Sequence, residues 1–77
     1  MKKRSLLIMG HATSISLEDE FWETLKEISV EKTQSIQELI EQIDLTRTSN
    51  LSSAVRLFVL NHLKQKLQEY KEQTNSK

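Results

Sequence analysis

The sequence predicts a mainly α-helical chain with one short β-strand, followed by three helices, that folds together with a second identical copy. Apolar and small polar residues alternate over residues 11–17, as in a strand with one buried face. Three segments with apolar residues at helical spacing then follow, and the chain contains no proline. Its 77 residues suffice for a single domain, 1–77, of a size that is marginally stable alone.

The predicted strand covers about residues 11–17. Its two faces differ in chemistry. His11, Thr13, Ile15 and Leu17 fall on one face, and Ala12, Ser14 and Ser16 fall on the other. Residues 5–9 are a possible extension of the strand, in which case Gly10 would form a bend or bulge.

The three helices are predicted from their start signals. Acidic residues 18–20 favour the first turn of a helix over about 18–32. Ser35 and Glu38 form a capping box at the start of a helix over about 36–46. Asn50 is the expected N-cap of a longer helix over about 51–72, and residues 73–77 are expected to fray.

The isolated strand predicts a homodimer. A single strand leaves backbone donors and acceptors unpaired along both edges, and the sequence shows no second clear strand. Two copies would satisfy them by pairing antiparallel about a two-fold axis. The predicted dimer core contains Ile15, Leu17, Phe21, Trp22, Leu25, Leu39, Ile40 and Ile43.

Three segments carry a resemblance to a known family. The stretches "GHATSISLEDEFW", "SIQELI" and "NLSSAVRLFVLNHL" resemble a bacterial subgroup of the ribbon-helix-helix DNA-binding proteins, over about residues 3–63. The resemblance implies a sequence-specific transcriptional regulator, acting as a repressor, whose dimeric β-ribbon enters the major groove of double-stranded DNA. In addition to the elements of this family, the sequence predicts a long C-terminal helix.

The resemblance also implies site residues. The base-contacting positions are Ala12, Ser14 and Ser16, and the backbone phosphate would be held at Ser35 and Ile36. Lys2, Lys3 and Arg4 are expected to form a flexible arm on the phosphates. Two positions depart from the subgroup: Ala12 replaces the arginine that precedes "TSISLE", and Thr33 replaces the glycine of the turn before the second helix.

Several classes of function are not expected. The chain has no cysteine, and its two histidines, His11 and His62, lack metal-ligand spacing, so neither a metal, a cofactor nor enzymatic activity is predicted. The longest apolar run, residues 6–9, is far too short to span a membrane, and we expect a cytoplasmic protein. Charge is balanced overall but acid-rich over residues 18–44.

Two further interpretations concern partners. The chain could instead be a dimeric protein–protein interaction module that kept the fold and lost DNA binding, an alternative motivated by Ala12 and the acidic first helix. In the third helix, residues 60, 63, 67 and 70 follow the spacing of a short coiled-coil seam. This seam could pack on its own dimer, join two dimers into a higher oligomer or dock a partner; we expect packing on the dimer over residues 51–63 and association over the remainder. Arg56 is expected to pair with Glu41 or Asp44 of the second helix.

Overall fold

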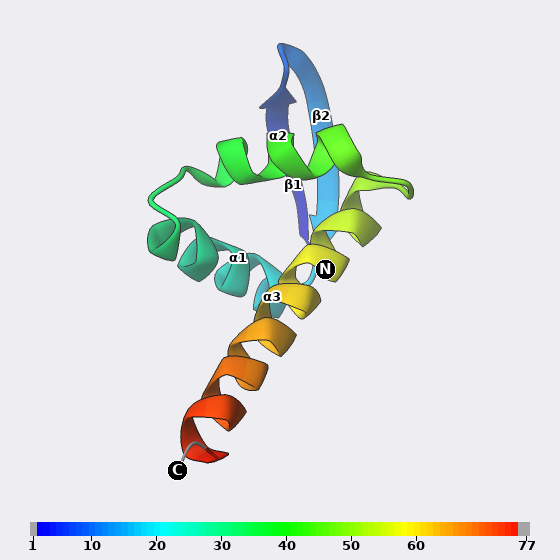
Figure 1. The fold of residues 1–77 in the computed structure, drawn as a ribbon. Helices are drawn as coiled ribbons and strands as arrows, with labels where there is room; N and C mark the ends of the chain where they lie inside the picture. The colour runs from blue at the N-terminus through cyan, green and yellow to red at the C-terminus, as the bar shows by residue number, and fades with distance from the viewer. Residues whose placement is uncertain (1, 76–77) are drawn as a thin grey trace.

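The computed structural model describes residues 2–75 as a β-hairpin followed by three helices (Figure 1). The elements are β1 (Lys2–Ile8), β2 (His11–Leu17), α1 (Asp19–Glu31), α2 (Ile36–Thr46) and α3 (Leu51–Asn75). In Figure 1, α2 crosses the hairpin, and the second half of α3 extends away from the other elements. The molecule is therefore elongated, with extents of 51 × 24 × 23 Å.

The sheet forms within one chain. β1 and β2 are antiparallel, with Ile8 opposite His11 and Lys2 opposite Leu17. Met9 and Gly10 connect them with φ angles of +52° and +82°, and two consecutive left-handed residues are the mark of the type I′ turn that closes two-residue hairpins. The prediction of one strand per chain is wrong, because Gly10 closes a turn that folds residues 2–8 back onto β2. Pairing of β2 with a second copy stays a prediction.

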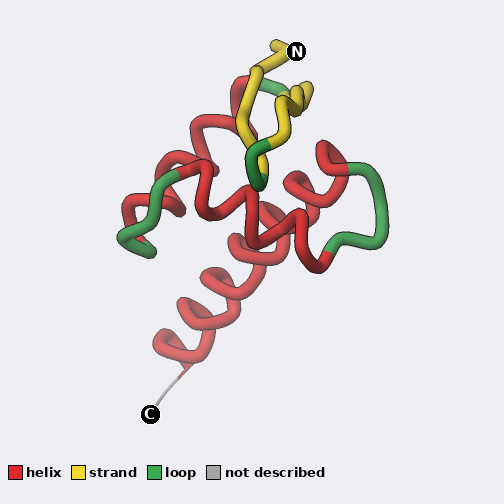
Figure 2. Tube along the Cα trace, turned by 90° about the horizontal axis from the view of Figure 1, so that it is seen from above, coloured by secondary structure: helices red, strands yellow, loops and turns green. Residues whose placement is uncertain are grey.

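One face of the hairpin closes the hydrophobic core. Figure 2 shows the hairpin at one edge of the molecule with the helices to one side of it. The buried core residues are Ile8, Ile15, Leu17, Leu25, Ile28, Leu39, Ile40, Ile43, Leu51, Val55 and Val59. Phe21 and Trp22 pack against this cluster and are partly buried. The predicted core residues thus lie in or against the core of a single chain, and their role between two chains stays a prediction.

The helix ends follow the chemistry of their caps. The Glu38 amide donates to the Ser35 hydroxyl, and the Ser35 amide donates to the Glu38 carboxylate, which completes the capping box of α2. The Ser53 amide donates to the Asn50 side chain at the start of α3. At its other end α3 continues to Asn75, so residues 73–75 are helical where fraying was expected, and residues 76–77 lie outside the described chain.

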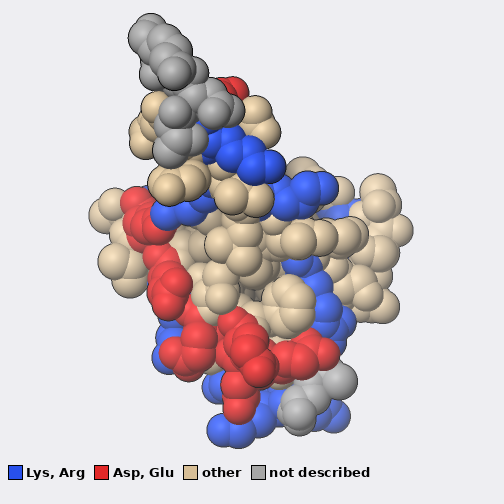
Figure 3. Space-filling model, turned by 90° about the horizontal axis from the view of Figure 1, so that it is seen from below, with Lys and Arg blue, Asp and Glu red and all other residues tan. Residues whose placement is uncertain are grey.

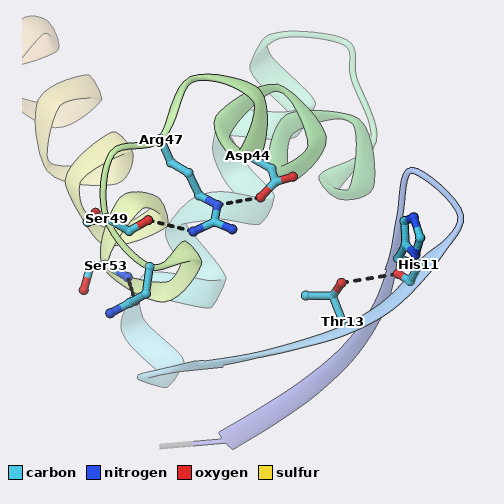
Figure 4. A network of polar contacts seen from close by, with 7 residues as sticks. His11, Thr13, Asp44, Arg47, Ser49 and Ser53 are labelled. Carbon is cyan, nitrogen blue, oxygen red and sulfur yellow. Dashed lines mark hydrogen bonds and ion pairs between the residues drawn. The ribbon is translucent and has the colours of Figure 1, made fainter.

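The connections around α2 use local polar contacts. After α1, the Thr33 amide donates to the Val30 carbonyl and the Gln34 amide to the Ser29 carbonyl, the two bonds of a Schellman motif. Thr33 holds the left-handed position of this motif, with φ +56°. After α2, the Arg47 guanidinium bridges the Asp44 carboxylate and the Ser49 carbonyl (Figure 4).

The hairpin turn gives a first prediction. An added Cβ at Gly10 meets no atom within 4 Å, so Gly10→Ala tests backbone strain alone. We expect this variant to lose about 1 kcal/mol of unfolding free energy, because alanine is strained at positive φ. Met9→Asn should instead gain on the order of 0.5 kcal/mol, since Asn-Gly is a preferred type I′ pair. Urea denaturation measures both, and equal stability of the two variants would contradict the turn assignment.

A second prediction concerns Thr33. A β-branched residue is strained in the left-handed region, whereas glycine is the usual residue at this Schellman position. We expect Thr33→Gly to raise the unfolding free energy by about 0.5 kcal/mol, a net value after the greater flexibility of glycine in the unfolded chain. Thr33→Ala keeps a Cβ and should gain less. A loss of stability in Thr33→Gly, measured by thermal or urea unfolding, would contradict this prediction.

Candidate nucleic-acid interface

The face of the hairpin that points away from the helices combines residues of both strands. It is made of three cross-strand pairs: Lys3 with Ser16, Ser5 with Ser14, and Leu7 with Ala12. All of these residues are exposed except Ser16, which is half-buried. The predicted base-contacting residues thus share one face, and β1 adds a lysine, a serine and a leucine that the sequence prediction did not place there.

The C-terminal end of this face is fixed by α3. The Ser16 amide donates to the Ser52 hydroxyl oxygen at 3.1 Å, and the Ser16 carbonyl accepts from the Arg56 guanidinium at 3.1 Å. A two-residue turn makes Ile8 and His11 a hydrogen-bonded pair, and bonded and non-bonded pairs alternate from there, so Lys3 and Ser16 are a non-hydrogen-bonded pair. The Ser16 amide and carbonyl therefore point away from β1. The outer edge of β2 is therefore already bonded to α3 at Ser16.

The same arginine ties the sheet to α1. Arg56 Nε lies 2.9 Å from the Glu18 carboxylate, so the expected pairing of Arg56 with Glu41 or Asp44 is wrong. Glu18 lies between β2 and α1, two residues after the Ser16 carbonyl that Arg56 also binds. The Arg56 hydrogen bond, followed by a backbone hydrogen bond, holds the pKa of Glu18 below its ordinary value.

The basic N-terminus is a strand and not a flexible arm. Lys2 and Lys3 are exposed, but Arg4 is on the inner face of β1, and its guanidinium carbon lies 4.2 Å from the centroid of the Trp22 ring. Its Nε is buried and has no hydrogen-bond partner among residues 2–75. This geometry is a cation–π contact, and it directs the Arg4 side chain away from the outward face.

The predicted phosphate position lies at the N-terminus of α2. The Ser35 amide there already donates to the Glu38 carboxylate. The next amide, that of Ile36, has no acceptor among residues 2–75. Glu41, in the middle of α2, accepts from the Met9 amide at the hairpin turn. Ser35 is six residues earlier, about 9 Å further along the helix axis. The helix terminus therefore flanks the hairpin and does not touch its turn.

Acidic side chains form a band on the face seen in Figure 3, where the band curves down one side of the view and ends beside Lys and Arg side chains. At the end of α1, Glu31 pairs with both Lys66 and His62 of α3. The Lys66 hydrogen bond is the largest effect on Glu31, and together with the His62 hydrogen bond it holds the pKa of Glu31 below its ordinary value. Desolvation of the carboxylate opposes both. This pairing joins α3 to α1 at a point remote from the hairpin's outward face.

Two searches of the described chain returned nothing. Within residues 2–75, no three histidine or acidic side chains are grouped closely enough to hold a metal ion. Over the same residues, every helix is too short or too polar to cross a membrane.

One comparison with known proteins gave a match. A family model described as a ribbon-helix-helix domain matches residues 1–63. The match includes the hairpin, α1, α2 and the first half of α3, so the second half of α3 lies outside it. Searches of curated proteins and of solved structures found no match to this chain.

The Arg56–Glu18 pair gives a pH-dependent prediction. Because the pKa of Glu18 is lowered in the folded state, its contribution to stability is present above the ordinary glutamate pKa of 4.5 and is lost as the pH falls through the lowered value. We expect Glu18→Gln to be less stable than the wild type at pH 7. At acid pH, where Glu18 is protonated, we expect the two proteins to be equally stable. Urea unfolding across pH measures the difference, and the same comparison in an Arg56→Met background should show a smaller one, because only the backbone hydrogen bond then lowers the pKa.

Proposed function

The chain belongs to the ribbon-helix-helix family, whose members are in general DNA-binding transcription regulators, and we propose that it is a sequence-specific repressor that binds double-stranded DNA as a homodimer in the bacterial cytoplasm. The observation that carries the proposal is the outward face of the hairpin. It presents hydroxyls at Ser5, Ser14 and Ser16 on an exposed two-stranded ribbon. A ribbon of this kind enters the major groove, where serine bonds to either donors or acceptors of base edges.

Two groups near this face can hold phosphates. Lys3 is exposed beside Ser16 and has the charge that phosphate contacts need. The free Ile36 amide lies at the positive end of the α2 dipole, where anions are favoured. Glu38 occupies the neighbouring Ser35 amide, so a phosphate there would rely on Ile36 or displace the carboxylate. Such contacts set the position of the protein on the duplex without reading sequence.

The homodimer is supported by unpaired apolar surface as well as by the family. Proteins of the family typically form dimers. The chain exposes large apolar side chains over half of α3: Leu57, Leu60, Leu63, Leu67 and Tyr70. A small monomeric protein rarely exposes so many contiguous apolar residues without a partner. These residues extend beyond the family match, which ends at residue 63.

The competing function is a dimeric interaction module without DNA binding. Two observations favour it. Ala12 offers only a methyl group where the related subgroup has arginine, and Arg4 is held against Trp22. Lys3 is then the one charged residue on the outward face. The DNA-binding experiment below decides between the two functions.

The direct test is selection of binding sites from randomised duplexes, together with the DNA upstream of the protein's own gene. We expect one preferred site, bound at least about 10³-fold more tightly than random duplex at about physiological salt. Ser14→Asp should weaken binding to this site more than tenfold, because its carboxylate would face the base edges and phosphates. Fluorescence anisotropy measures both affinities, and the same titrations give the stoichiometry of protein to duplex.

Ser49→Asp is the matched control. It introduces the same charge at an exposed serine on the α2–α3 connection (Figure 4). We expect its affinity to match that of the wild type. A wild-type protein that does not distinguish its best site from random duplex would reject DNA recognition and leave the interaction module.

A further inference from the structure

We propose that the second half of α3 pairs in parallel with the same segment of a second copy, and that Lys64 of each copy contacts Glu20 on α1 of the other. The inference rests on the homodimer of the proposed function and names a surface that holds it together. This surface, the α3 seam, consists of Leu60, Leu63, Leu67 and Tyr70. It lies apart from the hairpin (Figure 1) and leaves the outward face of the hairpin free to bind DNA.

The α3 seam is an apolar stripe that residues 2–75 leave about half-exposed. Its four side chains are 46–64% exposed. They follow at intervals of three, four and three residues, which places them at the a and d positions of a heptad, on one side of the helix. Because a and d residues of one helix pack between those of a facing helix, the same stripe of a second copy is a fitting partner.

On one side of the α3 seam lies the acidic face of α1. At the C-terminal end of α1, Glu31 pairs with Lys66. Near its N-terminal end, the exposed Glu20 lines a groove of about 180 Å³ together with Val59. Positions 59 and 66 are one heptad apart, and they are the g positions that border the seam on this side. The rim of the seam toward α1 therefore carries carboxylates.

On the other side of the α3 seam lie lysines. Lys64 is two residues from Lys66, about 200° around the helix, so it lies away from α1. Lys64 and Lys71 occupy the e positions, and both are exposed. On the face seen in Figure 3, uncharged side chains lie between the acidic band and Lys and Arg side chains at the opposite edge. The seam thus has a carboxylate rim and a lysine rim.

This charge pattern selects the orientation of two paired copies. In an antiparallel pair related by a two-fold axis, each rim faces the same rim of the second copy, so Lys64 would face Lys64. In a parallel pair, the e positions of one helix face the g positions of the other, so the lysine rim faces the carboxylate rim. Opposite charges attract across such rims and like charges repel. The parallel pair is therefore favoured.

The register of the parallel pair identifies the contacts. An e residue faces the g position five residues earlier on the second copy, so Lys64 lies level with Val59. Glu20 borders the same groove as Val59 and is the carboxylate that the lysine meets there. One heptad later, Lys71 lies level with position 66, where Glu31 supplies the carboxylate. Two-fold symmetry forms each contact twice.

The parallel orientation also suits the proposed function. The hairpin lies toward the N-terminal end of α3, and the C-terminus lies at the other end (Figure 1). Parallel pairing of α3 places both hairpins at the same end of the dimer, where they can engage one duplex. Antiparallel pairing would hold the hairpins at opposite ends. The orientation that the rims favour is thus the one that binding to a single site requires.

The first test measures dimer affinity by sedimentation equilibrium of the full chain without DNA. We expect Leu67→Ala to raise the dissociation constant at least about tenfold, because two leucines leave the interface. Lys64→Glu and Glu20→Lys should each raise it about fivefold or more, and the double variant should return to within about twofold of the wild type. Gln65→Glu adds the same charge on the opposite side of α3 and should change nothing.

The second test determines the orientation by cross-linking, since the natural chain has no cysteine. In the parallel pair the two copies of residue 60 are adjacent, so Leu60→Cys should form a disulfide-linked dimer under mild oxidation. In an antiparallel pair, residue 60 would face residue 70 of the second copy, about 15 Å along the helix from its own counterpart. A mixture of Leu60→Cys and Tyr70→Cys should therefore give no 60–70 product.

The outcomes separate this inference from the proposed function. If the wild type dimerises but Leu67→Ala and both charge reversals leave its affinity unchanged, or if the 60–70 product forms, the inference is wrong and the homodimer stands. A wild type that sediments as a monomer would reject both the inference and the homodimer. Selection of binding sites tests DNA recognition independently of these results.

Discussion

The left-handed turn at Met9 and Gly10 is the constraint on which the remaining structure depends. It returns the chain within two residues, and the return pairs all seven residues of β1 with β2, with alternate residues hydrogen-bonded across the pair. It also sets the register, and the register decides which side chains face outward. Arg4, Leu6 and Ile8 then point to the helices, and the serines point to solvent. A one-residue shift of β1 would turn Ser5 toward the core and expose Leu6 and Ile8.

α3 completes what the hairpin begins. Its first half fills the core with Leu51, Val55 and Val59. Its polar residues Ser52 and Arg56 hold the last residues of β2 and the start of α1. A small domain buries little apolar surface, so these hydrogen bonds between the sheet edge and the helices add stabilising contacts to those of the apolar core. The second half of α3 adds Lys66 and His62 to this role through Glu31.

Sequence reasoning succeeded where local chemistry decides the structure. The capping box of Ser35 and Glu38 located the start of α2, and strict alternation located β2. It gave residues 5–9 only as a possible extension of the same strand and did not pair them with residues 11–17, because residues 6–9 are a continuous apolar run without alternation. The signal that could have found this strand is Gly10 itself, since a glycine in the second position of a two-residue turn predicts a hairpin.

Other differences between the predicted and the observed structure came from tertiary contacts that no local sequence pattern reveals. The position of Arg56 on its helix did not indicate whether its partner would come from α2 or from the residue before α1. Arg4 belongs to a basic run that resembles a phosphate-binding arm, but the ring of Trp22 takes its guanidinium. Thr33 occupies a conformation that disfavours it, because the Schellman hydrogen bonds after α1 and the capping box of Ser35 fix the chain on both sides.

The hairpin changes what a second copy contributes. A lone strand needs partners at both edges, and β1 supplies one edge of β2 within the chain, while α3 is bonded to the other edge at Ser16. Yet the outward face carries one lysine, and each neutralised phosphate adds only about 0.9 to the salt slope. One hairpin thus offers little of the electrostatic attraction that supplies most non-specific affinity. Two linked hairpins would engage the same duplex, with the second binding at the effective concentration set by the first. In the proposed regulator, dimerisation therefore adds to the affinity for DNA.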